Sequence, residues 1–313
     1  MKAAVVTSFN VPPSYQEFPV PTPAGPNEVL VDVLASGLHR RVRSQADGSH
    51  YTSTGDLPLV PGVDGVARMP DDTLRYFALG DTTAGAMAEH TVIDLRQSFE
   101  LPAGADPVLV AAAMNPAMSA WVALRRRIEF QGGQTVLVLG ATGSSGQLAV
   151  QVAKRLGAGR VIAAGRDPQK LAALPALGAD GIVRLGDGPG IGELAAEVDV
   201  VIDYLWGQPT VDAMTAIGIN RVDRRRPLSW IEIGAVAGPD AAIPSAALRA
   251  LPLQIFGSGQ GSVSTADLLA ELPALADEIT SGALRLDVRA VSLADVTSAW
   301  QDTASDTRVV LTP

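Results

Sequence analysis

A glycine-rich turn between an apolar run and a helical stretch restricts the fold of this chain more than any other feature of its sequence. The run Thr135–Leu139 leads into Gly140-Ala-Thr-Gly143-Ser-Ser-Gly146, and a helical pattern then continues from 147 to 156. In such a turn the N–H groups at the helix N-terminus face a pyrophosphate, and glycine places no Cβ in its path. The spacing predicts a dinucleotide-binding unit, since the packing of a helix on a strand would explain one glycine but not three.

The residues around this turn predict a doubly wound parallel sheet. From 135 to 257, short apolar runs alternate with helical stretches, as the buried strands of such sheets do. Six strands are expected, at Thr135–Leu139, Arg160–Ala164, Gly181–Leu185, Val198–Asp203, Ser229–Ile233 and Leu253–Gly257.

Residues 1–105 instead show short strand-like runs between Gly and Pro residues, which is typical of an all-β domain. Strands are expected at Ala3–Val6, Glu28–Ala35, Gly62–Arg68 and Ala88–Asp94, with a loop-rich stretch from 36 to 57. After 258, a helix over Thr265–Thr280 and strands at Asp287–Val291 and Arg308–Leu311 are too few for a separate domain. The predicted domains are therefore 1–114 completed by 258–313, and 115–257.

The composition limits which partners the chain can have. It has 313 residues, no cysteine and a formal net charge of −9, which excludes thiolate chemistry and disfavours binding to nucleic acid or anionic membranes. A small-molecule partner is expected instead. The first residues lack the apolar core of a signal peptide, which indicates a cytoplasmic protein. The apolar stretch 108–124 is shorter than a usual membrane span and predicts a buried core segment broken at Pro116.

The end of the second predicted strand favours NADP over NAD. Gly165 leaves room for a 2′-phosphate, Arg166 offers a planar cation to pair with it, and Lys170 lies one helical turn further on. The alternative is that Arg166 is merely solvated and that Asp167 binds the ribose or caps a helix. In the turn itself, backbone and hydroxyl groups are expected to bind phosphate oxygens; the residues are Gly140, Thr142, Gly143, Ser144, Ser145 and Gly146.

Motifs along nearly the whole chain resemble those of the medium-chain dehydrogenase/reductase superfamily. Besides the glycine turn they are Glu28-Val-Leu-Val-Asp-Val-Leu-Ala-Ser-Gly37, Pro61-Gly-Val-Asp-Gly65, Gly85-Ala-Met-Ala-Glu-His90, Leu177-Gly-Ala-Asp180, Val200-Val-Ile-Asp203 and Val291-Ser-Leu-Ala-Asp-Val296. The resemblance implies an α/β fold with a Rossmann doubly wound sheet and a GroES-like β-barrel catalytic domain. Where zinc alcohol dehydrogenases carry metal-site motifs, this chain has His39, Val63 and Asp64. It is therefore most similar to the zinc-independent quinone oxidoreductase and enoyl reductase branch, and no metal site is expected.

The resemblance also implies where cofactor and substrate lie. The nicotinamide is expected between the domains, with further cofactor contacts from Ser119, Asp203, Tyr204, Ile233, Gly234, Ala235 and Ser258. The substrate pocket is expected to contain His39, Tyr51, Asn115, Trp206 and Gln260, of which His39, Tyr51 and Asn115 are the predicted catalytic residues. His39 would donate a hydrogen bond to a developing oxyanion and Tyr51 would donate a proton. Either could instead be a loop residue without a chemical role.

Without a metal to polarise a carbonyl, conjugated acceptors are the easier substrates, because charge spreads onto an oxygen that hydrogen bonds can stabilise. We therefore expect an NADPH-dependent, zinc-independent reductase of quinones, enones or related acceptors. The alternatives are a biosynthetic enoyl reductase or an alcohol/carbonyl dehydrogenase without zinc, and a non-catalytic NADP(H)-binding structural or sensor protein. The resemblance implies a homodimer paired along Leu253–Gly257. A solvated loop, or alternatively an anionic-substrate site, is expected at Arg221, Arg224, Arg225 and Arg226.

Overall fold

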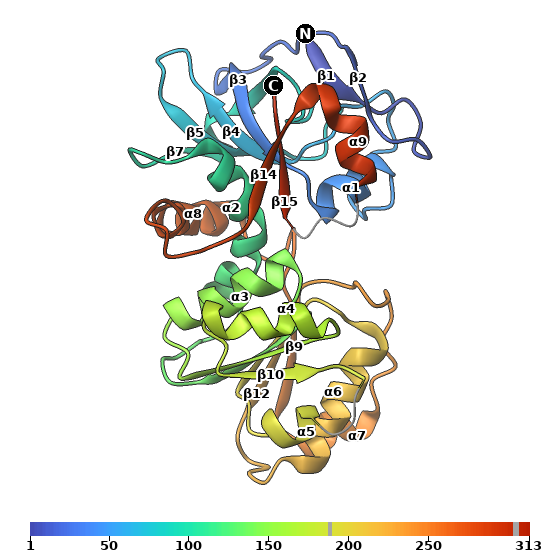
Figure 1. The fold of residues 1–313 in the computed structure, drawn as a ribbon, viewed down its shortest axis with the longest axis vertical. Coiled ribbons are helices and arrows are strands. Elements are labelled where there is room, and N and C mark those ends of the chain that lie inside the picture. Colours follow the sequence, from blue (N-terminus) through green and yellow to red (C-terminus); the bar gives the residue numbers. More distant parts are fainter. Residues whose placement is uncertain (187–189, 303–306) are drawn as a thin grey trace. The chain divides into compact units, whose positions relative to one another are not determined.

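The computed structural model describes residues 1–186, 190–302 and 307–313. Its contacts divide the chain into two compact units, Met1–Asn115 with Leu269–Pro313, and Pro116–Leu268 (Figure 1). The domain limits predicted from the sequence differ from this division mainly over residues 258–268, which the contacts assign to the second unit.

The unit Pro116–Leu268 is built on a six-stranded parallel sheet. Its strands are β8 (Thr135–Leu139), β9 (Arg160–Gly165), β10 (Gly181–Arg184), β11 (Val200–Asp203), β12 (Leu228–Glu232) and β13 (Leu253–Gly257). They lie in the order β10-β9-β8-β11-β12-β13, which confirms the six predicted strands and the doubly wound Rossmann sheet. Because the strand order reverses between β8 and β11, the ligand crevice of such a fold lies beyond the carboxyl ends of these two strands.

Helices connect these strands and cover the sheet. They are α3 (Ser144–Arg155), α4 (Pro168–Ala173), α5 (Gly190–Leu194), α6 (Gly207–Asn220) and α7 (Ser245–Ala250). The four inner strands β9, β8, β11 and β12 are mostly buried, as strands of a parallel sheet are when helices cover both faces, whereas the edge strands β10 and β13 are partly exposed. Leu137, Ile162, Val201 and Trp230 lie fully buried in one core that joins four of the strands.

The other unit is mainly antiparallel sheet. Its elements are β1 (Lys2–Val5), β2 (Ser14–Glu17), β3 (Glu28–Gly37), α1 (Arg40–Ala46), β4 (Asp64–Arg68), β5 (Leu74–Ala78), β6 (His90–Asp94), β7 (Ser98–Glu100), β14 (Val288–Ser292), α9 (Val296–Gln301) and β15 (Arg308–Thr312). The large sheet has the order β14-β15-β3-β4-β5-β7, β6 also pairs with β3, and β1 pairs with β2. Since β15 runs antiparallel to β3, the C-terminal segment returns to the sheet of the N-terminal one.

One short helix replaces a predicted loop. Helix α1 lies inside the stretch 36–57, where the sequence favours loop. It has seven residues, and Val42 and Ala46, four positions apart, give it a buried face. Seven residues are too few for a helical period to stand out among arginines. The prediction was therefore wrong here, and this helix fixes the position of His39 immediately before it.

Pro116 does not break the apolar segment. It lies inside α2 (Pro107–Val122), which continues as a π-helical turn over Ala123–Arg127. Small buried residues around the proline let the helix pack closely, and the Ser119 hydroxyl donates to the Pro116 carbonyl oxygen at 2.7 Å. The whole helix has 21 residues and its most apolar 18-residue window has a mean hydropathy of 1.5, so its length and composition would allow a membrane span, contrary to the prediction. However, 67% of its most apolar window is buried inside the protein, as in the core helix of a soluble protein.

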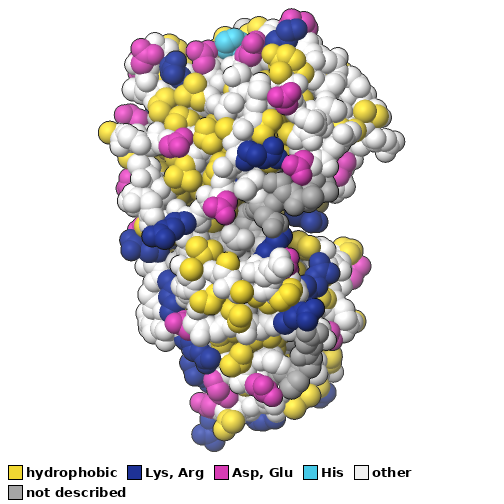
Figure 2. Space-filling view, in the orientation of Figure 1, with side chains coloured by type: hydrophobic (Ala, Val, Ile, Leu, Met, Phe, Trp, Pro, Cys, Tyr) yellow, Lys and Arg dark blue, Asp and Glu magenta, His cyan; other side chains and the backbone are white. Residues whose placement is uncertain are grey.

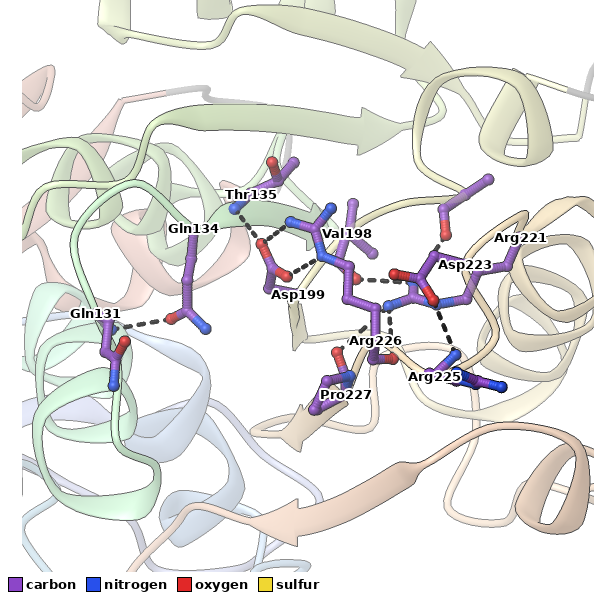
Figure 3. A network of polar contacts seen from close by, with 11 residues as sticks. Gln131, Gln134, Thr135, Val198, Asp199, Arg221, Asp223, Arg225, Arg226 and Pro227 are labelled. Atoms are coloured by element: carbon purple, nitrogen blue, oxygen red, sulfur yellow. Dashed lines mark hydrogen bonds and ion pairs between the residues drawn. The ribbon is translucent and has the colours of Figure 1, made fainter.

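Two arginines of the predicted solvated cluster are structural. Arg221 is 2% exposed and donates to the carbonyl oxygens of Ala196, Val198, Arg226 and Pro227 (Figure 3). Arg226 forms a two-pronged ion pair with Asp199. The expectation of a solvated loop is therefore wrong for Arg221 and Arg226, whereas Arg224 and Arg225 are exposed.

This network lies at the amino ends of the strands. Asp199 precedes β11 and also accepts the N–H of Thr135, the first residue of β8, at 2.8 Å. Arg226 precedes β12. The arginines therefore join three strands at the edge opposite the one where such sheets bind ligands, which argues against an anionic-substrate site there.

The face of the protein in Figure 2 carries lysine and arginine side chains at scattered points, with acidic and apolar side chains between them. On this face the two signs of charge are mixed, although the sequence as a whole has a formal net charge of −9.

Candidate nucleotide site and active site

The glycine turn needs two of its glycines for its own geometry. Gly140 has a φ of +84°, and the N–H groups of Gly140 and Ala141 donate to the Ala164 carbonyl oxygen at 3.0 and 2.9 Å. A Cβ on Gly146 would lie 2.3 Å from the carbonyl oxygen of Gly140. Packing of α3 on β8 thus explains two glycines, where the sequence argument attributed only one to packing.

Gly143 serves no such purpose. A Cβ there would meet only the Gly140 carbonyl oxygen, at 3.8 Å. Gly143 is the N-cap of α3, and no side chain caps the helix. The N–H groups of Ser144, Ser145 and Gly146 therefore have no partner within the helix. They lie at the positive end of a helix with no acidic residue in its first turn, which is the arrangement that binds phosphate groups.

Gly165 has a packing role that the sequence does not predict. A Cβ on this residue would lie 2.6 Å from Cγ2 of Thr142. The space that a Cβ would take is thus filled by the Thr142 side chain, and the predicted contact of Gly165 with a 2′-phosphate stays a prediction. The missing Cβ lets the glycine turn pack against the end of β9.

Cations gather beyond the ends of β9 and β10. Arg166 is exposed, and its side chain has no hydrogen bond or ion pair with any residue that the structure describes. Asp167 accepts the N–H groups of Gln169 and Lys170 at 2.9 and 3.2 Å, which makes it the N-cap of α4. Of the two alternatives for Asp167, the structure shows the helix cap.

Arg184 was missed by the sequence analysis. It is the last residue of β10 and pairs in register with Gly165 at the end of β9. Its Nε donates to the Arg166 carbonyl oxygen at 3.4 Å. With Lys170 on the first turn of α4, three cationic residues surround the end of β9. Only the pairing of the strands reveals Arg184, because 18 residues separate it from Arg166.

Asp203 organises the loop after β11. It is fully buried, and its two oxygens accept from Leu205 N (2.8 Å), Trp206 N (3.1 Å), Thr210 Oγ1 (2.5 Å) and Trp230 Nε1 (2.9 Å). All of these donors belong to the protein, so the carboxylate has a structural role here. The predicted contact of Asp203 with the cofactor stays a prediction.

The loop that Asp203 holds contains an unusual backbone. Trp206 has a φ of +52°, rare for a residue with a side chain, and Gly207 follows with +66°. Such a conformation costs about 1–3 kcal/mol and persists only where the surroundings impose it. The loop after β12 is joined to this one, since Ile233 N and Gly234 N donate to the Asp203 carbonyl oxygen at 2.8 and 3.2 Å. The structure thus brings the predicted residues of both loops together.

Tyr204 and Ser119 form one pair. Their hydroxyl groups lie 2.8 Å apart. Because the Ser119 hydroxyl donates to the Pro116 carbonyl oxygen, Tyr204 is the donor of the pair. Burial raises the pKa of Tyr204 far above its ordinary value and keeps the proton in place. Two residues that the sequence assigned to the cofactor therefore also support each other.

The remaining predicted residues of this unit lie at or near the same edge. Ser258 is buried and follows β13, and its N–H donates to the Glu232 carbonyl oxygen at 2.8 Å. Ala235 and Gln260 are exposed. Glu232, which the sequence analysis did not select, ends β12 opposite Asp203. Burial, and then the charge of Asp203, raises the pKa of Glu232.

In the other unit, His39 forms a buried pair. Its Nε2 lies 2.9 Å from Oδ1 of Asp64, and the Tyr76 hydroxyl donates to Oδ2 of Asp64 at 2.8 Å. The three residues are 5%, 2% and 1% exposed. They come from the start of α1, from β4 and from β5, so the sheet brings together residues that are distant in sequence. The predicted active-site histidine therefore has a specific partner.

Tyr51 lies in a different environment. It is 72% exposed, and its ring packs on that of His50 with 4.2 Å between the ring centres. Asn115 is partly buried on α2, four residues before Ser119, so the two side chains share one face of the helix. The catalytic roles of Tyr51 and Asn115 stay predictions.

Comparison with known proteins gives two informative relatives. Over the full length of both chains, this protein is 32% identical to the probable NADPH-dependent quinone reductase tdiC of Emericella nidulans. It is 29% identical to quinone oxidoreductase-like protein 2 of Rattus norvegicus over 78% of this chain and 71% of that one. No family model matches the chain.

Solved structures resemble the whole chain. The quinone oxidoreductase of Thermus thermophilus, also solved in complex with NADPH, is 25% identical with a TM-score of 0.80 and full coverage of both chains. An alcohol dehydrogenase superfamily protein of Novosphingobium aromaticivorans has a TM-score of 0.84 at 24% identity, covering 100% of this chain and 99% of that one. These likenesses confirm the predicted fold class, a Rossmann sheet with a GroES-like unit.

Proposed function

The chain belongs to the medium-chain dehydrogenase/reductase superfamily, in its quinone oxidoreductase-like branch, and we propose that it is an NADP(H)-dependent oxidoreductase of conjugated acceptors. The acceptor would be a quinone, an enone or another compound with a conjugated C=C or C=O bond. The observation that carries this proposal is the uncapped N-terminus of α3 at the exposed residue Gly143, together with Arg166 at the end of the next strand, whose cation has no partner among the described residues.

The nucleotide site fits the cofactor at both of its phosphate positions. A pyrophosphate would meet the N–H groups and hydroxyls of Ser144 and Ser145, where the helix dipole favours negative charge. A 2′-phosphate would meet Arg166, Lys170 and Arg184, since the neighbouring carboxylate of Asp167 is engaged in capping α4. A planar guanidinium suits a phosphate because it donates two parallel hydrogen bonds. NADP(H) is therefore preferred over NAD(H).

When bound, NADPH supplies a hydride, and the protein has to orient the acceptor and stabilise the charge that develops on its oxygen. The loops after β11 and β12 are suited to orientation because Asp203 and the backbone hydrogen bonds between them hold both in place. Trp206 would form an apolar wall of the pocket, with Gln260 at its edge. His39, Tyr51 and Asn115 would contribute polar groups.

We further propose that the reaction needs no zinc. Among the described residues no three His, Cys, Asp or Glu side chains lie close enough together to hold a metal. At the positions where zinc alcohol dehydrogenases carry metal-site motifs, His39 Nε2 and Asp64 Oδ1 are engaged with each other. The Val63 side chain has no atom that could bind a metal. These residues do not form the set of about three ligands on a rigid frame that a catalytic zinc requires. Stoichiometric zinc in the purified protein would contradict this proposal.

We also propose a cytoplasmic homodimer. The support for the dimer is β13, an edge strand on which Gln254 and Ile255 are exposed, because an open parallel edge can pair with a second copy. The support for a small-molecule partner in the cytoplasm is the acidic composition, which disfavours anionic polymers and surfaces.

Binding and turnover test the proposed function separately. Calorimetric titration should show that R166A weakens NADPH about tenfold or more, as expected for a lost charged hydrogen bond of about 1.5–3 kcal/mol, and leaves NADH unchanged. R224A is the matched control, since Arg224 is exposed but lies near the opposite edge of the sheet. An equal effect of R166A on both cofactors would contradict the NADP assignment.

Turnover is measured as NADPH oxidation with a panel of quinones, enones and enoyl thioesters. Oxidation with quinones or enones supports the proposal, and activity restricted to enoyl thioesters would favour the biosynthetic alternative. Tight NADPH binding without oxidation by any acceptor of the panel would favour the non-catalytic alternative and overturn the proposed activity.

A further inference from the structure

One nitrogen of His39 is left without a hydrogen-bond partner in the core of its unit. Nε2 is engaged with Asp64, but Nδ1 is buried and meets no donor or acceptor among the described residues. His39 is also the N-cap of α1, yet its side chain does not cap that helix. Because an unpaired buried polar atom costs about 1–3 kcal/mol, a purely structural histidine is a poor explanation of this arrangement.

The neighbours of His39 determine which nitrogen carries the proton. Burial, followed by the charge of Asp64 and its hydrogen bond, raises the pKa of Tyr76 well above its ordinary value, so Tyr76 can only donate to Asp64. A carboxylate has only acceptor atoms, so Asp64 is the acceptor toward His39 Nε2 as well. The neutral imidazole therefore carries its proton on Nε2, and Nδ1 presents a free lone pair.

Charged groups from several elements face this imidazole. Burial lowers the pKa of His39, Asp64 opposes that effect, and the cations Arg308 of β15 and Arg41 of α1 add to it. Arg41 is itself paired with Asp81 at 2.6 Å. Burial also lowers the pKa of Arg308 to about 10, and Asp64 opposes it. Burial and the two cations thus favour the neutral imidazole, whereas the carboxylate of Asp64 stabilises the protonated form.

We propose that His39 Nδ1 is the acid–base atom of the reaction and that Asp64 is its positioning residue, with Tyr76 restraining the carboxylate. This inference rests on the proposed function. The reduced product needs a hydride and a proton. The hydride comes from the bound cofactor, and His39 gives the proton from Nδ1 to the oxygen of the acceptor. The imidazole then returns to its neutral form and takes a new proton from water, and in the reverse direction it takes the proton from a hydroxyl group.

This arrangement assigns His39 a role different from the one predicted from the sequence. A neutral imidazole with its proton on Nε2 cannot donate a hydrogen bond from Nδ1 to an oxyanion. It donates there only as the imidazolium, which Asp64 stabilises. Because Nδ1 is closed to bulk water, the side chains over it must shift when an acceptor approaches.

Nuclear magnetic resonance tests the pair without relying on activity. The chain has three histidines, and ¹H–¹⁵N spectra of their rings report tautomer and pKa. His39 is identified by the signal that H39Q removes; glutamine keeps a donor for Asp64 but has no titrating nitrogen. We expect the Nε2–H tautomer, and a shift of this signal when a substrate analogue is added to the NADP⁺-bound protein. An Nδ1–H tautomer would overturn the proposal.

Two partner variants should move the His39 pKa in opposite directions. D64N removes the anion and should lower it further. Y76F removes a donor that draws charge from Asp64 and should raise it. D32N is the matched control, because Asp32 forms the same kind of pair with the surface residue His90 at 3.0 Å and should leave His39 unchanged. If D64N does not fold, Y76F alone tests the direction in which the His39 pKa moves. An unchanged or lowered His39 pKa in Y76F would contradict the proposal.

Kinetics then connect the pair to the reaction. The rate of acceptor reduction should fall as pH rises through the His39 pKa, and that limb should move to lower pH in D64N and to higher pH in Y76F. H39Q should lose about 10²–10⁴-fold in kcat, the usual contribution of acid–base catalysis, together with this limb. If H39Q keeps the turnover rate and the pH profile of the wild type, the role of His39 is overturned, but the proposed function is not. If the wild-type protein itself reduces no acceptor, the proposed function is overturned instead.

Discussion

Replacement of Asp203 by asparagine tests whether one buried carboxylate holds the loop at the nucleotide edge. Its two oxygens accept four hydrogen bonds, from the N–H groups of Leu205 and Trp206, the Thr210 hydroxyl and the Trp230 indole. Asparagine keeps one acceptor oxygen, which can serve two donors, and turns its own N–H groups toward the other two. Each unpaired buried donor costs about 1–3 kcal/mol. D203N should therefore lower the free energy of unfolding by about 2–6 kcal/mol. The total free energy of unfolding of a protein is usually about 5–15 kcal/mol.

Urea unfolding followed by tryptophan fluorescence measures this loss, because Trp230 is fully buried and bonded to Asp203. T210V is the matched control, because it removes the Thr210 hydroxyl donor and keeps the shape of the side chain. It should lower the free energy of unfolding by about 1 kcal/mol. D203N should also weaken NADPH binding, since it removes two of the four hydrogen bonds that hold the loop at Trp206 to its surroundings. Unfolding of D203N within about 1 kcal/mol of the wild type would refute the reasoning, because two buried donors left without acceptors should cost more than that.

Two further substitutions separate packing from ligand binding in the glycine turn. G146A should lower the melting temperature strongly, because its Cβ would lie 2.3 Å from a carbonyl oxygen. G143A should melt at the same temperature as the wild type and bind NADPH more weakly. Equal losses of melting temperature would contradict this division. The stability of the protein should also depend on pH through His39. Because burial lowers the His39 pKa in the folded state, the unfolded chain takes up the proton at higher pH, and the free energy of unfolding should fall as pH drops below about 6.5. Urea titrations at several pH values should show that the free energy of unfolding falls less at low pH in H39Q than in the wild type. The same fall in both proteins would contradict this dependence on His39.

The parallel sheet could be predicted because its strands are short, mostly apolar runs that alternate with helical stretches, and several of them lie next to glycines. A run such as Thr135–Leu139 has no competing interpretation once a glycine turn and a helix follow it. Helix α1 could not be predicted in the same way. Val42 and Ala46 are the only apolar residues of its buried face, and the three arginines among its seven residues resemble a solvated loop. The continuous helix through Pro116 was missed because the packing that holds it is tertiary, whereas the helix-breaking tendency of proline is local.

The nucleotide site shows the same limit. The sequence predicted Arg166 because a known fold places the end of the second strand at the ribose. Arg184 could not be predicted, since only the register of β10 against β9 places it beside Gly165. The packing role of Gly165 could not be predicted either, because its contact with Thr142 is made across the turn. In the other unit the resemblance selected His39 and Asp64, while their hydrogen bond depends on how α1 and β4 meet.

The two ends of the parallel sheet use arginine in opposite ways, and the difference follows from what each arginine faces. Arg221, at the amino ends of the strands, is 2% exposed and satisfies four carbonyl oxygens of its own chain, so its charge serves the fold. Arg166, at the carboxyl ends, is exposed and has no partner among the described residues, so its charge remains available to an anion. A count of basic residues treats these two arginines as equal. The site is recognised only when the strand order shows at which end of the sheet an arginine lies and the hydrogen bonds show whether it is already engaged.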